Sequence, residues 1–153
     1  MIESTPPDVQ IFRDQTIREF PIPAYASAGA AGFDLRVNAD YVIEPGRTEK
    51  CGTGLFFAVP SGYELQIRMR GGTSYKGLLL VNAPGTVDSD YRGELLLLLY
   101  NRTEQPIQLQ KGDRVCQGVI ALAPQHKIVE VGNIDDLGKT DRGEGRLGST
   151  GSK

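Results

Sequence analysis

Hydrophobic and polar residues alternate over short segments of this chain, and no long segment repeats with the 3.6-residue period of an amphipathic helix. The clearest alternation spans residues 63–70, where Tyr63, Leu65, Ile67 and Met69 share one face and Glu64, Gln66, Arg68 and Arg70 share the other. This pattern predicts a strand with one buried face, and it places two arginines on the polar face.

Two further segments, residues 95–99 and 115–122, are almost continuously apolar. Such strands are buried on both faces, and in a chain of 153 residues this favours packing against another subunit. Shorter strand candidates span residues 9–13, 32–37, 41–44, 54–59, 78–81 and 127–131. Nineteen glycines and nine prolines supply the tight turns between them. The pattern predicts one all-β domain, built as a sandwich, a jelly roll or a barrel.

The charge of the chain excludes several classes of partner. A net charge of −2 and an isoelectric point near 5.4 give no general attraction to nucleic acid or to an anionic membrane. No apolar run reaches the roughly 18 residues of a membrane span, and the first residues lack the basic and apolar regions of a signal peptide. We therefore expect a cytoplasmic protein, or a nuclear one in a eukaryote, that binds any anionic ligand by local charge.

Cysteine and histidine chemistry is poorly supported. Cys51 and Cys116 both fall in expected strands, where a free buried thiol acting as a small hydrophobic group is the favoured interpretation over a disulfide. The one histidine, His126, has no neighbouring ligands at metal-site spacing and no partners for a Ser-His-Asp triad. A hydrolase without such groups can use a carboxylate to activate water.

The residues from Asn82 to Glu94 are the strongest candidate for a functional site. Pro84-Gly85 is a turn dipeptide between two apolar flanks, which predicts a hairpin with an exposed tip. On an extended segment beyond the turn, Asp88 and Asp90 point to one side. Val87, Ser89 and Tyr91 point to the other side unless the turn twists them, so a carboxylate and an aromatic ring would flank one small cavity.

This tract resembles the third motif of the trimeric dUTPase family, and four other segments resemble the remaining motifs in the family's order. These are Ala31-Gly32-Phe33-Asp34-Leu35, Arg70-Gly71-Gly72-Thr73-Ser74, Gly112-Asp113-Arg114-Val115-Cys116-Gln117, and the segment Arg142-Gly143-Glu144-Gly145-Arg146-Leu147-Gly148-Ser149-Thr150-Gly151. The resemblance covers roughly residues 23–151, nearly the whole chain.

The resemblance implies an activity and a quaternary structure. The fold would be a jelly-roll β-barrel over residues 1–135, assembled as a homotrimer, with residues 136–153 as a flexible, glycine-rich arm that closes over the site. The reaction would be Mg²⁺-dependent hydrolysis of dUTP to dUMP and pyrophosphate. Such an activity prevents incorporation of uracil into DNA and supplies dUMP for dTMP synthesis.

The resemblance also implies roles for individual residues. Asp88 would activate the water that attacks the α-phosphorus, Asp90 would be structural, and Tyr91 would lie under the sugar and exclude a 2′-hydroxyl. Uracil would be read by the hairpin, through Asn82, Gly85, Thr86 and Val87.

The triphosphate would be held by the other motifs. Arg70, Gly71, Gly72, Gln117 and Arg142 would bind the phosphates, and Ser149 and Thr150 would offer hydroxyls to the γ-phosphate. Leu147, at the position that stacks on uracil in the family, and Gly148 would also contact the substrate. Asp34 would orient waters on a Mg²⁺ ion that is bound chiefly by phosphate oxygens.

Two positions depart from the family pattern and leave alternatives open. Gly71 stands where the second motif usually has serine, and Leu147, preceded by Arg146, stands where the fifth usually has an aromatic residue. A regulatory protein that senses dUTP on the same scaffold, a relative of the dCTP deaminases, and a purely structural jelly-roll protein are the competing interpretations.

Overall fold

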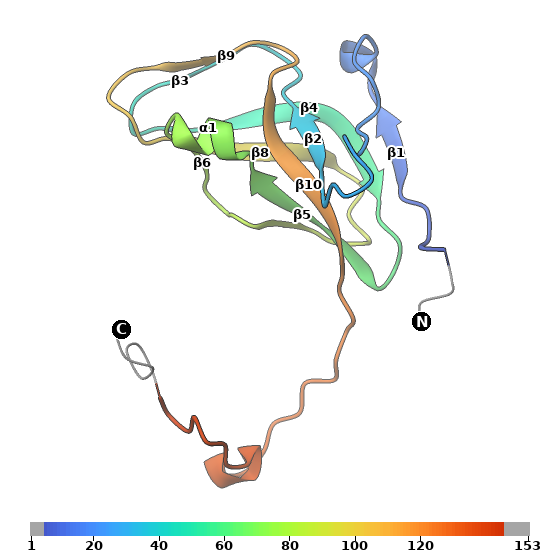
Figure 1. Cartoon of the computed structure of the whole chain (residues 1–153), viewed down its shortest axis with the longest axis vertical. Coiled ribbons are helices and arrows are strands. Elements are labelled where there is room, and N and C mark those ends of the chain that lie inside the picture. Colours follow the sequence, from blue (N-terminus) through green and yellow to red (C-terminus); the bar gives the residue numbers. More distant parts are fainter. Residues whose placement is uncertain (1–4, 146–153) are drawn as a thin grey trace.

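The computed structural model describes residues 5–145 and consists mainly of antiparallel β-strands arranged in two layers (Figure 1). The first sheet contains four strands in the order β1-β4-β8-β6. These strands are β1 (Gln10–Arg13), β4 (Thr48–Ala58), β8 (Glu94–Asn101) and β6 (Leu78–Leu80).

The second sheet also contains four strands, in the order β2-β10-β5-β7. They are β2 (Phe33–Arg36), β10 (Arg114–Leu122), β5 (Tyr63–Met69) and β7 (Gly85–Val87). A two-stranded ribbon joins β3 (Tyr41–Ile43) to β9 (Ile107–Leu109). The helical segments are short: η1 (Gln15–Ile17), α1 (Gly71–Tyr75) and η2 (Ile134–Leu137).

One hydrophobic core lies between the layers. Leu35, Leu65, Leu97, Leu99 and Val115, from both sheets, are at most 1% exposed. The prediction of an all-β fold is confirmed, and the arrangement is a jelly roll. The described strands form open sheets and no closed barrel, so the barrel part of the expectation is corrected. None of the helices within residues 5–145 is long and apolar enough to cross a membrane.

The alternation over residues 63–70 gives the strand that it predicts. Leu65 and Ile67 of β5 are buried, whereas Arg68 is exposed. The expectation for β8 is only half met, because Leu95, Leu97 and Leu99 point into the core while Leu96, 38% exposed, points outward. Within one chain this strand is therefore buried on one face only.

The predicted strand at residues 127–131 is wrong for the isolated chain. After β10 the chain leaves the two-layer body and runs away from it as an extended segment (Figure 1). No regular element forms before η2, and Ile128 is 96% exposed. A strand needs a neighbour to satisfy its backbone groups, and no other described strand pairs with this segment.

Both cysteines are free and buried, as the sequence predicts. Burial raises the pKa of each thiol to about 12. The Cys116 Sγ lies 3.7 Å from the Sδ of Met69, within the core of the second layer. Neither thiol is a nucleophile at neutral pH, so the cysteines serve packing.

Candidate functional site

The first group of candidate residues gathers where β5 ends and α1 begins. Arg70 directly follows β5 and has an extended backbone, and its carbonyl accepts a hydrogen bond from the Ser74 amide at 2.9 Å. A cavity of about 550 Å³ opens beside this turn. Its lining includes Arg70, Gly71, Gly72, Thr73, Lys76, Arg114 and Gln117. The fold thus brings the second and fourth motifs together at one cavity.

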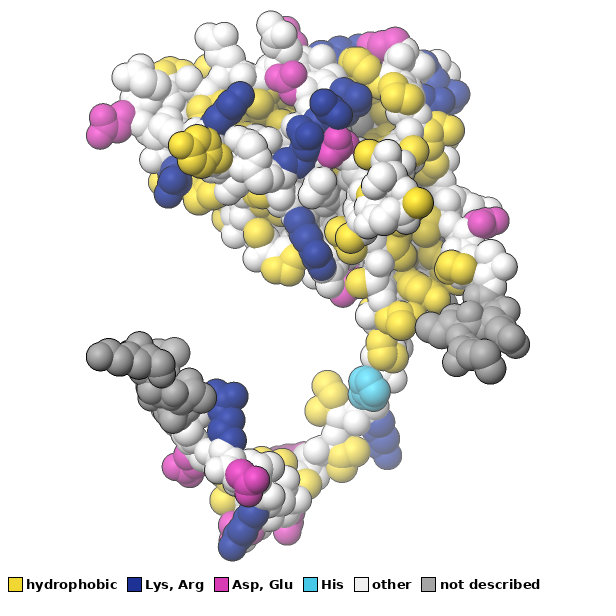
Figure 2. All heavy atoms as spheres, in the orientation of Figure 1, with side chains coloured by type: hydrophobic (Ala, Val, Ile, Leu, Met, Phe, Trp, Pro, Cys, Tyr) yellow, Lys and Arg dark blue, Asp and Glu magenta, His cyan; other side chains and the backbone are white. Residues whose placement is uncertain are grey.

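Asp34 of β2 forms ion pairs with two arginines at this cavity. Its Oδ1 lies 2.9 Å from Arg70 Nε, and its Oδ2 lies 3.2 Å from Arg114 Nη1. Arg70 Nη1 also donates to the Arg114 carbonyl at 3.0 Å. Because Asp34 occupies the Nε side of the Arg70 guanidinium, that side chain is held in one orientation with further donors free for an anion. Figure 2 shows lysine and arginine side chains gathered over this face of the body.

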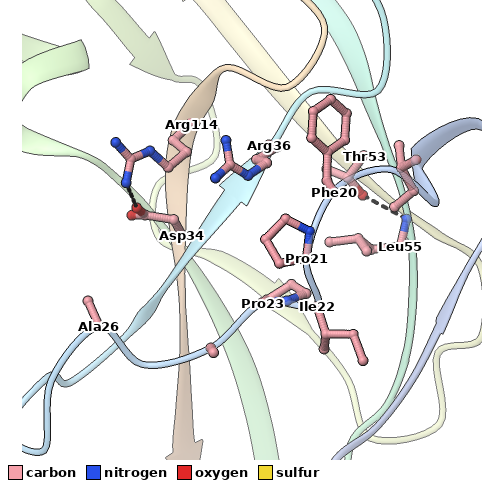
Figure 3. A pocket seen from close by; sticks show the side chains of 12 residues that line it. Phe20, Pro21, Ile22, Pro23, Ala26, Asp34, Arg36, Thr53, Leu55 and Arg114 are labelled. Carbon is pink, nitrogen blue, oxygen red and sulfur yellow. Dashed lines mark hydrogen bonds and ion pairs between the residues drawn. The ribbon is translucent and has the colours of Figure 1, made fainter.

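A smaller cavity is lined by Asp34 itself, and it shares Arg114 with the larger one. It has a volume of about 220 Å³ and is walled by apolar side chains, including Phe20, Pro21 and Ile22 (Figure 3). Arg36 and Arg114 enter it from β2 and β10. Arg36 lies over the Phe20 ring, 5.7 Å from its centroid, and donates to the Gly112 carbonyl at 2.6 Å. The Arg36 guanidinium is therefore engaged by contacts within the fold.

The second group of candidate residues surrounds Asp88. A cavity of about 620 Å³ is lined by Thr86, Asp88, Ser89, Asp90 and Glu64, among others. Val87 is buried, whereas Thr86 and Asp88 are exposed. Asp88 directly follows β7, which pairs with β5 and has no second neighbour among the described strands. The unpaired side of β7 therefore presents backbone donors and acceptors beside the carboxylate.

The tract between β6 and β8 differs from the simple hairpin predicted from the sequence. The two flanks do lie in one sheet, with Leu80 opposite Leu99. The turn between them is exposed at Asn82, Ala83 and Pro84, but the tract is not a simple two-stranded hairpin, because β7 crosses to the other sheet and pairs there, with Ile67 opposite Gly85. Ala83-Pro84 is a cis peptide bond in the connection. At Gly85 a Cβ atom would lie 3.2 Å from Ile67 and 3.4 Å from Asn82 Nδ2, so a glycine fits best here.

Tyr91 leaves the strand alternation because the chain turns after β7. The Tyr91 amide donates to the Asp88 carbonyl at 3.1 Å, which closes the turn. The Tyr91 hydroxyl donates to the Glu94 carbonyl at 3.0 Å, and its ring lies over Gly93. Tyr91 as a whole is 43% exposed. Tyr91 is therefore held at its hydroxyl end and presents its ring to solvent.

The two groups lie at opposite ends of β5. The register pairs Leu65 with Val87, so Asp88 lies beside Glu64, whereas Arg70 is six residues further along the chain. At about 3.3 Å per residue, Asp88 and Arg70 are separated by roughly 20 Å. The predicted base and the predicted phosphate ligand of one chain cannot reach the same phosphorus atom.

The fifth motif is described only in part. Arg142 lies in the exposed C-terminal segment, where its Nε donates to the Gly145 carbonyl at 3.2 Å, and it lines neither cavity. The structure thus keeps Arg142 apart from the other candidates. Leu147, Gly148, Ser149 and Thr150 lie outside the described residues.

Three residues at or beside these sites were not predicted from the sequence. Arg114 and Lys76 add positive charge to the cavity that holds Arg70. Glu94 is hydrogen bonded to the backbone of β4. Arg114 and Glu94 both lie inside motif segments, and this was the signal in the sequence that could have pointed to them. Among residues 5–145, no group of three or more His, Cys, Asp or Glu side chains is arranged to hold a metal ion.

The chain is similar to known proteins over most of its length. A family model described as dUTPase matches residues 18–151. A protein of Caulobacter vibrioides named deoxyuridine 5′-triphosphate nucleotidohydrolase is 51% identical over 138 residues, 87% of this chain and 87% of its own length. One of Brucella suis with the same name is 42% identical over 154 residues, 97% of this chain and 96% of its own.

A solved structure shares the fold. The dUTPase of Staphylococcus bacteriophage 80alpha, described with dUPNHPP, superposes with a TM-score of 0.85 over 94% of this chain and 98% of that chain. At 22% sequence identity this likeness shows the fold alone. With the family model covering most of the chain and the bacterial relatives well above 30% identity, the chain belongs to the dUTPase family.

Proposed function

We propose that the protein hydrolyses dUTP to dUMP and pyrophosphate. The observation that carries the proposal is the ion pair between Asp34 and Arg70 at the cavity that also contains Gln117. Three of the motifs thereby meet in one anion-binding arrangement, in a chain whose net charge is −2. The curated bacterial relatives bear the name of that activity. A cytoplasmic location belongs with this proposal, because nucleotides are hydrolysed where DNA precursors are made.

The phosphates would be bound at the Arg70 cavity. Arg70 keeps guanidinium donors free of Asp34, and Gly71 and Gly72 are both exposed, with nothing within 4 Å of a Cβ position at either. Backbone amides can therefore approach phosphate oxygens closely. Gln117 lies beside Asp34 across the β2-β10 pair and reaches the same cavity. Exposed backbone amides would thus take the place of the serine hydroxyl that is missing at Gly71.

Mg²⁺ fits this donor set in an outer role. Among the described residues Asp34 is the one carboxylate paired to both arginines, and each of its oxygens keeps a lone pair that can accept a hydrogen bond from a metal-bound water. A Mg²⁺ ion held by phosphate oxygens usually keeps several waters, and it would neutralise charge on the departing pyrophosphate.

The base and sugar would be bound beside β7. Uracil presents an acceptor-donor-acceptor edge, which suits the unpaired backbone of β7 at Gly85, Thr86 and Val87, with Asn82 alongside. A cytosine there would leave polar groups unpaired, at about 1–3 kcal/mol each. The Tyr91 ring, fixed at its hydroxyl, would lie under the deoxyribose and clash with a 2′-hydroxyl.

Asp88 would be the general base. Its carboxylate lines the cavity beside β7 and would take a proton from the water that attacks the α-phosphorus. Asp90 lines the same cavity and would have the structural role expected for it. Arg70 would stabilise the charge that develops on the leaving pyrophosphate.

Each complete site would require more than one chain, which supports a homotrimer. The roughly 20 Å between Asp88 and Arg70 along β5 allows them to serve the same substrate only when they come from different copies. The outward face of the first sheet carries Phe12, 57% exposed, and Leu96, an apolar surface suited to another copy. Residues 127–131, unpaired within the chain, would find their strand neighbour there as well.

The C-terminal segment would complete the site as an arm. The described part extends away from the body in Figure 1, which leaves it free to reach a neighbouring copy. Arg142 would then bind phosphate, and Leu147, Gly148, Ser149 and Thr150 would cover the nucleotide. Closure of such an arm excludes water from the reaction.

Pyrophosphate release tests the proposal. Full-length protein and a form ending at Asp141 are compared with dUTP, dCTP, dTTP and UTP in Mg²⁺, with and without EDTA. Hydrolysis of dUTP alone, abolished by EDTA and by truncation, is the expected result. Tight binding of dUTP without turnover would replace it with the sensor, and ammonia released from dCTP would indicate a deaminase relative.

A further inference from the structure

Glu94 is the meeting point of a hydrogen-bond network at the start of β8, close in sequence to the Asp88 cavity. Its Oε1 accepts hydrogen bonds from the Thr53 amide at 3.0 Å and the Gly54 amide at 2.7 Å. It also accepts one from Asn38 Nδ2 at 3.1 Å. The two amides belong to the stretch of β4 where pairing with β8 shifts register, between Gly52 and Phe56. The carboxylate therefore satisfies backbone donors that the ladder leaves free.

The surroundings of Glu94 are shaped for this carboxylate. At Gly52 a Cβ atom would lie 2.7 Å from Glu94 Oε1 and 2.6 Å from Asn38 Nδ2, so only glycine leaves room for both. Asn38 is fixed in turn by the Tyr41 hydroxyl, which donates to Asn38 Oδ1 at 2.9 Å and accepts from the Gly52 amide at 2.8 Å. These contacts define one position for the start of β8.

The backbone of Glu94 holds Tyr91. The Tyr91 hydroxyl donates to the Glu94 carbonyl at 3.0 Å. A Cβ atom at Gly93 would collide with that hydroxyl oxygen, so a glycine is needed here to leave room for the Tyr91 ring. The hydroxyl end of the ring is thus tied to the residue whose side chain is anchored on β4.

We propose that Glu94 is a positioning residue for sugar selection. Its carboxylate fixes the start of β8 on β4, its carbonyl fixes the Tyr91 hydroxyl, and the ring is thereby held where it excludes a 2′-hydroxyl. This inference rests on the proposed hydrolysis of dUTP and on the place of Tyr91 under the sugar. It predicts that changes at Glu94 act on the choice between dUTP and UTP, beyond any effect on stability.

The test is the ratio of kcat/KM for dUTP to kcat/KM for UTP. Glu94→Ala should lower this ratio about 10-fold to 100-fold, the range for lost hydrogen bonds to a charged group. Glu94→Gln, which keeps the size and one acceptor oxygen, should lower it by about fivefold. The matched control is Glu104→Ala, an exposed acid in the loop before β9, which should leave the ratio unchanged.

A double variant separates positioning from general damage. Tyr91→Phe removes the hydroxyl link, so adding Glu94→Gln to it should cause no further fall in the ratio. A Glu94→Gln protein whose ratio equals that of the wild type would overturn the inference, even if its melting temperature falls. If Glu94→Ala does not fold, the Glu94→Gln ratio decides. A wild-type protein that fails to hydrolyse dUTP refutes the proposed function itself, which the wild-type assay reveals separately.

Discussion

Replacing Asp34 by asparagine should lower activity much more than it lowers the stability of the fold. The introduced side chain can still accept a hydrogen bond through its one carbonyl oxygen. Its amide nitrogen is a donor, however, and would face either Arg70 Nε or Arg114 Nη1, which are donors too. One of the two contacts must therefore break, and the other becomes a neutral hydrogen bond in place of an ion pair, so the Arg70 guanidinium is held less firmly in its orientation.

The expected change in stability follows from the solvent exposure of the three side chains in these ion pairs. The side chains of Arg70, Asp34 and Arg114 are 31%, 26% and 51% exposed, so solvent screens both pairs. Such pairs contribute about 0–1 kcal/mol each to the free energy of unfolding. Losing both would lower the melting temperature of a chain this size by less than about 8 °C. A misplaced charge-assisted phosphate contact, at about 1.5–3 kcal/mol, should lower kcat/KM for dUTP roughly 10-fold to 150-fold.

The assay is pyrophosphate release over a range of dUTP concentrations, with thermal unfolding measured on the same samples. Asp8→Asn, in the exposed segment before β1, is the matched control and should change neither quantity. Arg114→Gln leaves the Asp34–Arg70 pair intact and should cost less activity than Asp34→Asn. A kcat/KM within about threefold of wild type, or a melting temperature lower by much more than about 10 °C, would refute the reasoning.

Three other predictions address the reaction, the assembly and the core. Asp88→Asn should bind dUTP but turn it over about 100-fold to 10,000-fold more slowly, as single-turnover kinetics would reveal, because a general base is lost. Leu96→Asp places a charge on the outward apolar face of β8 and should disrupt the proposed homotrimer. Size-exclusion chromatography should then show a species smaller than the wild-type assembly, with little activity. Burial raises the pKa of Cys51 and Cys116 to about 12 from 9.0, so the two thiols should add no pH dependence to the free energy of unfolding below pH 9 and should lower it as the pH rises from 9 toward 12, as urea titrations of the wild type and of Cys→Ala variants at each pH would measure.

Local patterns predicted the strands whose neighbours lie in the same chain. The alternation in β5 depends only on the pleat and on one buried face, and the structure confirms it. The three residues of β7 were missed, because a strand so short carries no periodicity of its own. The segment 127–131 carries a strand pattern, but its pairing does not form inside one chain, and so the prediction failed there.

The motifs name candidate residues, but they do not reveal how those residues are arranged in space. Arg70 and Gln117 line one cavity, and Asp34 forms an ion pair with Arg70. The distance between Arg70 and Asp88 follows from the register of β5 with β7, which no spacing in the sequence reveals. Glu94 was missed for a related reason, since its carboxylate binds backbone amides about forty residues earlier in the chain.

The placement of Asp88 and Arg70 at opposite ends of β5 has a genetic consequence. If each chain lends its two ends to different sites, a chain defective at one end can be rescued by a chain defective at the other. Two inactive proteins, one altered at Arg70 and one at Asp88, would then regain activity when unfolded together and refolded. Random mixing would make roughly a quarter of the sites intact in a closed ring of identical contacts. Two recessive alleles of one gene could thus complement each other in a single cell.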